Sequence, residues 1–138
     1  MRFMIIVKAS RDSEEGIMPP EDVFTAMADY HETLAKAGVL LDANGLQPSS
    51  KGWRIEWSGG KRKPIDGPFA ETKELIAGYT IIQVKSREEA VRWAELFPNP
   101  GDADGAIEIR QLFELEDFEA NEAIERFRKM GVSQPPNN

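Results

Sequence analysis

His31 is the only histidine among the 138 residues, so it carries the only imidazole available for acid–base chemistry near neutral pH. It falls in a segment whose apolar residues recur every three or four positions, and it borders the apolar stripe of the helix that this pattern predicts. Two interpretations follow. His31 is either a half-buried residue whose ring nitrogens are satisfied by neighbours, or the acid or base of an active site.

Asp66 begins a second stretch whose residues could take part in chemistry, the run DGPFAETKEL that ends at Leu75. The chain must reverse tightly here, because Gly67 tolerates positive φ and Pro68 fixes its own φ. The Asp66 carboxylate would then either cap the turn, by accepting backbone N–H bonds from positions such as Phe69, or orient an imidazole or a substrate hydroxyl. Both roles are open at this point.

Three charged residues follow the turn within four positions, namely Glu71, Lys73 and Glu74. Glu71 and Glu74 are three residues apart, so they would share one side of a helical turn with the lysine between them. The lysine would neutralise one carboxylate while the other stays basic. The three residues would then provide a base with an adjacent cation. The alternative is a salt-bridged lip at the surface with no chemistry.

Four further charged residues alternate with apolar ones in segments of strand character: Arg54, Glu56, Glu108 and Arg110. If the large apolar residues face the helices, these four face the opposite side of the sheet. An arginine there would either pair with a glutamate or hold a small anionic ligand through two hydrogen bonds. Arg54, Arg110 and Lys73 are therefore the candidate ligand-binding cations.

The elements that must position these residues follow a recognisable order. A buried strand at 3–7 precedes a helix that begins after Pro19-Pro20 and ends at Gly38, and a strand interrupted by DANG follows at 39–47. A hairpin at 53–65 turns at Ser58-Gly-Gly, and its two tryptophans look like packing anchors. The chain continues with a strand at 79–84, a helix at 86–97 that opens on a capping box, a strand at 106–115 and a C-terminal helix.

This order predicts an α+β fold of the ferredoxin-like βαββαβ type, with an additional β-hairpin and a C-terminal helix. Two helices would cover one face of a mostly antiparallel sheet and leave the other face without a cover. Self-association is the simplest way to supply one, so we expect a homodimer or a higher homo-oligomer.

Composition limits the classes of function. The chain has 17 basic and 24 acidic residues and a net charge of −7, which argues against nucleic acid or a membrane surface as a partner. It lacks cysteine, has one histidine, and contains no phosphate-binding glycine motif, so we expect no metal and no organic cofactor. The apolar run near the N-terminus is too short for a signal peptide, so we expect a cytoplasmic protein.

The run DGPFAETKE at 66–74 resembles the signature of the DGPF branch of the YCII-related family. Further similarity lies at 34–41, 45–52, 78–79 and 108–110, and the resemblance covers one domain at 1–116. It leaves a C-terminal helix at 117–131 and a tail at 132–138 that we expect to be disordered. The resemblance implies a dimeric α+β barrel, in which two sheets close face to face. It also implies a site with a helix-borne histidine and an aspartate, and His31 stands in the comparable helix.

Two functions from different classes remain. The first is a cofactor-free acid–base enzyme, a lyase, isomerase or dehydratase, acting on a small carboxylated or aromatic molecule in a pocket of the dimer barrel. His31, Asp66 and Glu71 are its candidate catalytic residues. The second is a non-catalytic module for small-ligand binding or dimerisation, in which the DGPF turn only shapes the edge of the sheet. Convergence of these side chains on one concave pocket would favour the enzyme.

Overall fold

The structure is a computed structural model and describes residues 1–101 and 104–136. A four-stranded sheet forms the body of the molecule, with strand order β2-β5-β1-β6 and antiparallel pairing between all neighbours. The elements of this body are β1 (Arg2–Lys8), α2 (Glu21–Lys36), β2 (Leu40–Gly45), β5 (Ile76–Gln83), α3 (Arg87–Glu95) and β6 (Ile107–Gln111). The predicted ferredoxin-like topology is confirmed, and β1 is an interior strand.

Local signals set the limits of both long helices. α2 begins directly after Pro20 with two acidic residues, and it ends before Gly38, which adopts a φ of +75°. At the start of α3 the Ser86 side chain accepts a hydrogen bond from the Glu89 N–H. The Glu89 carboxylate accepts from the N–H of Lys85, and this bond lowers the pKa of Glu89.

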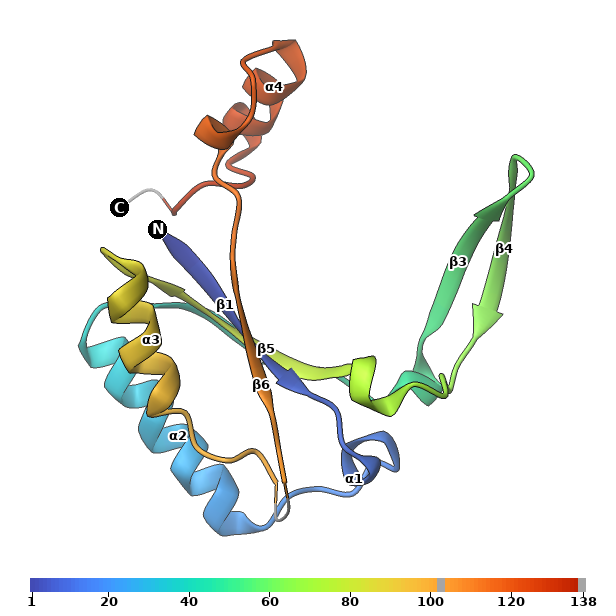
Figure 1. Cartoon of the computed structure of the whole chain (residues 1–138), viewed down its shortest axis with the longest axis vertical. Helices are drawn as coiled ribbons and strands as arrows, with labels where there is room; N and C mark the ends of the chain where they lie inside the picture. The colour runs from blue at the N-terminus through green and yellow to red at the C-terminus, as the bar shows by residue number, and fades with distance from the viewer. Residues whose placement is uncertain (102–103, 137–138) are drawn as a thin grey trace.

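The core lies between the sheet and these two helices, which cover the same face (Figure 1). Its fully buried members are Ile5 from β1, Leu34 from α2 and Ile82 from β5. Alternation along the strands explains the assignment, because Phe3 and Ile5 pair with Ile82 and Thr80 in register and all four side chains are buried.

The opposite side of the sheet, which we call the open face, has no helix over it in Figure 1. The residues between those of the core belong to it. On β1 and β5 they are half-buried, apart from the buried Arg2, and on β2 and β6 they are exposed. Its central members are Met4, Ile6, Tyr79 and Ile81. The single chain therefore leaves apolar side chains of the sheet partly in contact with water.

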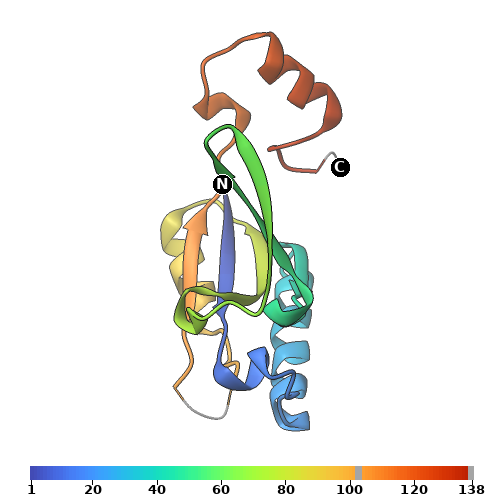
Figure 2. The ribbon, with the colours of Figure 1, turned by 90° about the vertical axis from the view of Figure 1, so that its right-hand side faces the viewer.

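A second, two-stranded sheet is formed by β3 (Trp53–Ser58) and β4 (Lys61–Asp66). This hairpin projects away from the body (Figures 1 and 2). Gly59 and Gly60 both have positive φ, which the tight turn between the strands requires. Trp53 and Trp57 are exposed, so the expectation that they anchor packing within the chain is wrong.

Short elements connect these parts. A helical turn, α1 (Arg11–Glu14), lies between β1 and α2, because Ser10 and Ser13 form a reciprocal capping box. Three single turns of 3-10 helix are η1 (Ser49–Lys51), η2 (Thr72–Glu74) and η3 (Leu115–Asp117). The stretch between α3 and β6 contains residues 102 and 103, which lie outside the described residues.

The C-terminal helix α4 spans Glu122–Met130 and lies beyond the end of β6 (Figure 1). Asn121 caps its first turn by accepting from the Ile124 N–H, and Gly131 ends it in the left-handed conformation. The side chain of Gln134 donates to the carbonyl of Arg128. The tail predicted at 132–138 includes residues 137 and 138, which lie outside the described part of the chain.

Candidate functional site

His31 lies between α2 and the sheet, and both of its ring nitrogens have partners. Nδ1 is 2.7 Å from the carbonyl oxygen of Met27, and Nε2 is 2.8 Å from the hydroxyl oxygen of Thr80. A carbonyl only accepts, so the hydrogen sits on Nδ1, and Nε2 of the neutral ring accepts from the Thr80 hydroxyl. Thr80 is only 2% exposed, so its hydroxyl depends on this bond. The ring of His31 therefore joins α2 to β5 on the covered face of the sheet.

Tyr30, the residue before His31, makes a similar connection between the two helices. Its hydroxyl donates to the backbone carbonyl of Trp93 on α3 at 2.7 Å. Burial of the phenol raises the pKa of Tyr30 to about 12. The rings of Tyr30 and His31 both meet Phe97 edge to face. The hydrogen bonds of Tyr30 and His31 thus link α2 to α3 and to the sheet.

The DGPF motif packs closely against the η1 turn. A Cβ placed on Gly67 would overlap the carbonyl oxygen of Ser49, so no side chain fits at this position. The peptide bond between Gly67 and Pro68 is cis. The N–H of Phe69 donates to the Ser49 hydroxyl at 3.1 Å, whereas the Asp66 carboxylate has no hydrogen-bond partner among the described residues. The motif therefore fixes the base of the hairpin through Gly67 and Phe69.

Ser49 extends this junction to the N-terminal part of the chain. Its N–H donates to the Glu14 carboxylate at 2.9 Å, and its hydroxyl donates to the other oxygen of the same carboxylate. α1, η1 and the DGPF motif are thus connected through one serine. Sequence reasoning missed this junction, because Glu14, Ser49 and Phe69 are far apart along the chain.

The charged residues after the motif form the single turn η2, in which the Glu74 N–H donates to the Glu71 carbonyl at 2.8 Å. In the part of the chain that the structure describes, Glu71, Lys73 and Glu74 form no ion pair. The cations predicted to bind ligand are also separated. The Arg54 guanidinium lies 3.7 Å from the centre of the Phe69 ring, whereas Arg110 is on β6 and pairs with Glu108 at 3.4 Å.

The open face carries two rows of residues that face one another across the four strands. One row runs Asp42, Ile81, Met4, Arg110, from β2 to β6. The row beside it runs Asn44, Tyr79, Ile6, Glu108. Each row is polar at both ends, and only the hydroxyl of Tyr79 interrupts the apolar middle. Neighbouring strands are about 4.8 Å apart, so each row spans about 14 Å.

At the β2 end of these rows the polar groups bind one another. The Tyr79 hydroxyl donates to one oxygen of the Asp42 carboxylate at 3.2 Å. The Asn44 side-chain amide lies 3.2 Å from the other carboxylate oxygen and 3.0 Å from the phenol oxygen, and it donates to both. This network is exposed. It joins a carboxylate to a phenol beside an apolar surface.

Sequence reasoning missed these three residues. The available signal was the alternation of Asp42 with Asn44 and of Tyr79 with Ile81. The register, however, depends on an irregularity between Leu40 and Asp42, which moves Asp42 to the open face. A register shift of one residue at this point would turn Asp42 and Asn44 to the covered face. Their position on the open face is therefore known only from the structure.

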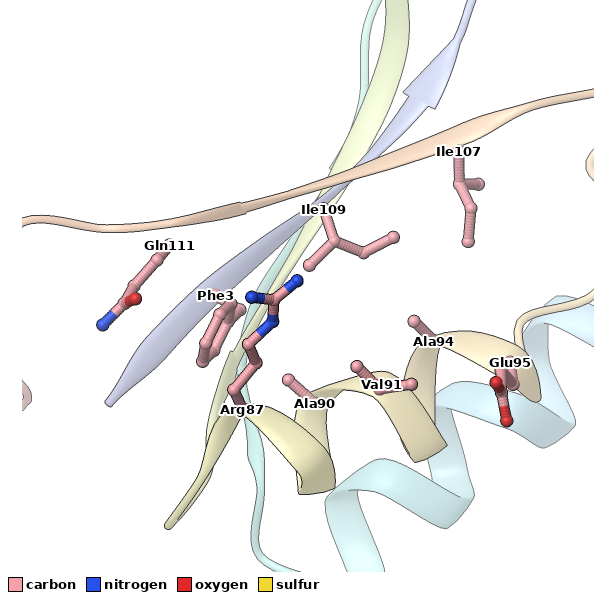
Figure 3. Close-up of a pocket in the computed structure, with 9 residues that line it drawn as sticks. All are labelled: Phe3, Arg87, Ala90, Val91, Ala94, Glu95, Ile107, Ile109 and Gln111. Atoms are coloured by element: carbon pink, nitrogen blue, oxygen red, sulfur yellow. The ribbon is translucent and has the colours of Figure 1, made fainter.

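A cavity of about 500 Å³ lies on the other side of the sheet, between α3 and strands β1 and β6 (Figure 3). Apolar side chains form most of its wall, with Arg87 and Glu95 toward its two ends. His31, Asp66 and Glu71 do not line it. Within the described residues, no group of three or more acidic or histidine side chains is placed to hold a metal ion. No helix in this part of the chain is long and apolar enough to cross a membrane.

The topology defines a ferredoxin-like α+β protein with an appended hairpin. The YCII-related domain model matches residues 1–116, and the chain belongs to this family. An uncharacterised protein of Rhizobium meliloti (strain 1021) is 32% identical over 103 residues, which cover 75% of this chain and 78% of the relative.

Among solved structures, the chain is similar to the 5-chloro-2-hydroxyhydroquinone dehydrochlorinase from Burkholderia phenoliruptrix AC1100, solved in complex with 2,5-dihydroxybenzoquinone. The sequence identity is 16%, the TM-score is 0.41, and the match covers 83% of this chain and 95% of that chain. A likeness at this level carries no information about activity.

Proposed function

We propose that the protein binds a small aromatic or carboxylated molecule on the open face of the four-stranded sheet. We propose further that its side chains act on this molecule by proton transfer. The observation that carries this proposal is the pair of cross-strand rows with polar ends. Such a surface matches a flat apolar ring with a polar group at its edge. Ligand sites in proteins typically combine an apolar lining with a few polar groups that fix orientation.

The two ends of the rows suit different parts of a ligand. Arg110 is a cation near the β6 edge, and a guanidinium binds a carboxylate through two parallel hydrogen bonds. Asp42 at the β2 edge is an acceptor for a ligand hydroxyl, and its bond from Tyr79 fixes the orientation of the carboxylate. A ligand with a carboxylate at one end and a hydroxyl at the other would satisfy both edges.

A second copy of the chain would complete the site. Two sheets that pack face to face are about 10 Å apart, which leaves room for a ring between them. Enclosure would also exclude water and strengthen the electrostatic interactions of Asp42 and Arg110. A homodimer closed over the open face is therefore part of the proposal. A mass of 15.5 kDa by light scattering at micromolar concentration would contradict it.

In the proposed reaction, Asp42 takes a proton from the bound molecule, and Tyr79 stabilises the resulting charge distribution through its hydroxyl. Proton removal of this kind begins the reactions of lyases, isomerases and dehydratases. His31 is proposed as a positioning residue, because its bond to Thr80 holds the strand from which Tyr79 projects. Asp66 and Glu71 stay predicted participants, and thermal shift with a bound probe tests them through Asp66→Asn and Glu71→Gln.

A non-catalytic binding module is the second candidate. One observation favours it, namely that both ring nitrogens of His31 are engaged in bonds that connect α2 to β5. This candidate needs the same surface and differs only in the absence of turnover. A ligand that binds and is recovered chemically unchanged after prolonged incubation would support the module over the enzyme.

The binding surface is tested by thermal shift with three probes: 4-hydroxybenzoate, benzoate and phenol. A ligand at a hundredfold excess over its Kd stabilises the folded state by about 2.7 kcal/mol. We expect 4-hydroxybenzoate to stabilise the protein most, and Asp42→Asn and Arg110→Gln each to reduce that effect. Glu88→Gln, an exposed change on α3, is the matched control. The proposal would be contradicted if 4-hydroxybenzoate stabilised all variants equally, or if no probe stabilised any of the proteins.

A further inference from the structure

One side of the β3–β4 hairpin is an exposed aromatic surface. Trp53, Ile55 and Trp57 alternate along β3 and point to the same side, and the tryptophans are 66% and 68% exposed. Their cross-strand partners on β4 are Asp66, Pro64 and Arg62. An isolated two-stranded hairpin is at best marginally stable in water, and large exposed aromatic side chains are typical of protein interfaces.

The hairpin is also basic. Lys61, Arg62 and Lys63 follow one another directly after the turn. The Arg62 guanidinium lies 5.9 Å from the centre of the Trp57 ring, so one cation stands on the aromatic side. None of the three forms an ion pair within the described residues. By the strand register, Lys61 and Lys63 face the other side of the hairpin, but residues 53–66 as a whole have four basic and two acidic residues. A partner for the hairpin should therefore offer both apolar surface and acidic side chains.

The segment from Leu112 to Gly131, which we call the C-terminal segment, has these two properties. It carries an exposed apolar set, in which Phe113 is 66% and Met130 is 64% exposed. The rings of Phe113 and Phe118 are 5.0 Å apart and form an aromatic pair. The set also includes Phe118 and Phe127, which are less exposed.

The charge of the C-terminal segment is opposite to that of the hairpin. The segment has six acidic residues, all from Glu114 to Glu125, and three basic ones after them, so it is acidic overall. Some of these carboxylates are already used, such as that of Glu114, which pairs with Arg2. Glu119 and Glu122 have no side-chain partner in the described part of the chain. They are available to cations of another molecule.

We propose that the hairpin of one copy packs its tryptophan side against the C-terminal segment of a second copy, and that the contact is reciprocal. Figure 1 shows the hairpin and α4 rising from different parts of the body, and Figure 2 shows that both extend toward the same end of the molecule. The aromatic residues of both remain exposed in the single chain, so the contact joins two copies. It uses other residues than the sheet contact of the proposed dimer and stands independently of the proposed activity.

The test uses two charge-reversed variants of the full chain. In the hairpin variant, the three basic residues are reversed (Lys61→Glu, Arg62→Glu, Lys63→Glu). In the segment variant, the two unpaired acids are reversed (Glu119→Lys, Glu122→Lys). Each variant alone places like charges in both copies of the contact. An equal mixture forms hybrid dimers in which both contacts again join opposite charges.

We expect each variant alone to dimerise with a Kd raised by about tenfold, which corresponds to roughly 1.4 kcal/mol. The mixture should return to within about threefold of the original Kd, a difference of roughly 0.65 kcal/mol. Sedimentation velocity over a range of concentrations measures both values. A matched reversal on α2, Glu21→Lys with Glu32→Lys, should leave the Kd unchanged. Recovery in the mixture also demonstrates that both variants are folded.

Fluorescence gives a second readout in a Trp93→Phe background, where only Trp53 and Trp57 emit. Their emission should shift to the blue as the concentration passes through the Kd, because the contact removes both rings from water. At a concentration where the unmodified protein is dimeric, the hairpin variant should still emit at the wavelength of the dilute, monomeric protein. Emission that does not depend on concentration, or a mixture that dimerises no better than its components, would overturn the proposal. Recovery only when both reversals are placed in one chain would show a contact within the chain and would overturn it as well.

Discussion

The two faces of the four-stranded sheet use polar residues in opposite ways. On the covered face, His31 and Thr80 bind each other between helix and strand, and Tyr30 binds a carbonyl of the next helix. On the open face, Asp42 and Tyr79 bind each other beside half-buried apolar side chains and keep access to solvent. Thr80 and Tyr79 are neighbours in sequence, so alternation along one strand separates a structural polar group from one that is available to a ligand.

The largest difference in the cost of a substitution to the free energy of unfolding should appear between two adjacent isoleucines of β5. Ile82 is fully buried on the covered face, whereas Ile81 is half-buried on the open face. Ile82→Ala should lower the free energy of unfolding by about 2–5 kcal/mol, because it leaves a cavity in the core. Ile81→Ala should cost less than half as much at concentrations where the chain is monomeric. Urea unfolding of both variants gives the comparison, and equal losses would contradict the assignment of faces.

The next effect concerns the bond between His31 and Thr80. Removing either partner leaves a buried polar group without its bond, so His31→Ala or Thr80→Val should cost about 1–3 kcal/mol. The double variant should cost less than the sum, because the first change already breaks the bond. Chemical denaturation of the three proteins measures this coupling. Strict additivity would show that the bond does not contribute.

Tyr30 gives a pH-dependent test of the covered face. The pKa of its phenol is raised to about 12 in the folded protein, against an ordinary value of 10.0. The unfolded chain therefore loses this proton first, and the stabilisation is complete below pH 10 and falls as the pH rises toward 12. Tyr30→Phe should cost about 1 kcal/mol at neutral pH, because the Trp93 carbonyl loses one of its two hydrogen bonds and keeps only that from the Leu96 N–H, and it should flatten this alkaline decline. Unfolding at several pH values between 8 and 11 measures the slope, and an unchanged slope in the variant would exclude Tyr30 as its source.

The smallest effect on stability is expected on the open face. Tyr79→Phe removes an exposed hydrogen bond to Asp42 and should change the free energy of unfolding by less than about 0.5 kcal/mol. The same change should weaken the binding of 4-hydroxybenzoate, because the Asp42 carboxylate loses the group that orients it. Thermal unfolding with and without the probe separates the two effects. A large stability loss with unchanged binding would make Tyr79 a structural residue.

The body of the fold was predictable from local patterns. The apolar stripe around Leu34, the proline before Glu21 and the capping residue Ser86 each act within a few positions, so they indicate helices directly. The position of His31 at the border of its stripe was predicted in the same way. Its partner Thr80 was not, because that contact depends on how α2 packs on β5.

The candidate site was less predictable, because it depends on strand register and on contacts between distant segments. Asp42 and Arg110 fall in one row only because β5 and β1 lie between their strands. The close approach of Gly67 to Ser49 explains why glycine stands in the motif, and no local pattern carries that information. The exposure of Trp53 likewise follows from a hairpin that leaves the body of the molecule.

The most direct test of the two-face account is a methyl NMR titration with 4-hydroxybenzoate, using protein labelled at the isoleucine δ1 methyls. Ile6 and Ile81 belong to the open face, whereas Ile5 and Ile82 lie directly beside them in sequence on the covered face. We predict that the Ile6 and Ile81 signals shift with a common Kd, and that the Ile5 and Ile82 signals move far less. Shifts centred on Ile107 and Ile109, which line the cavity beside α3, or no shift at any isoleucine, would contradict a ligand site on the open face.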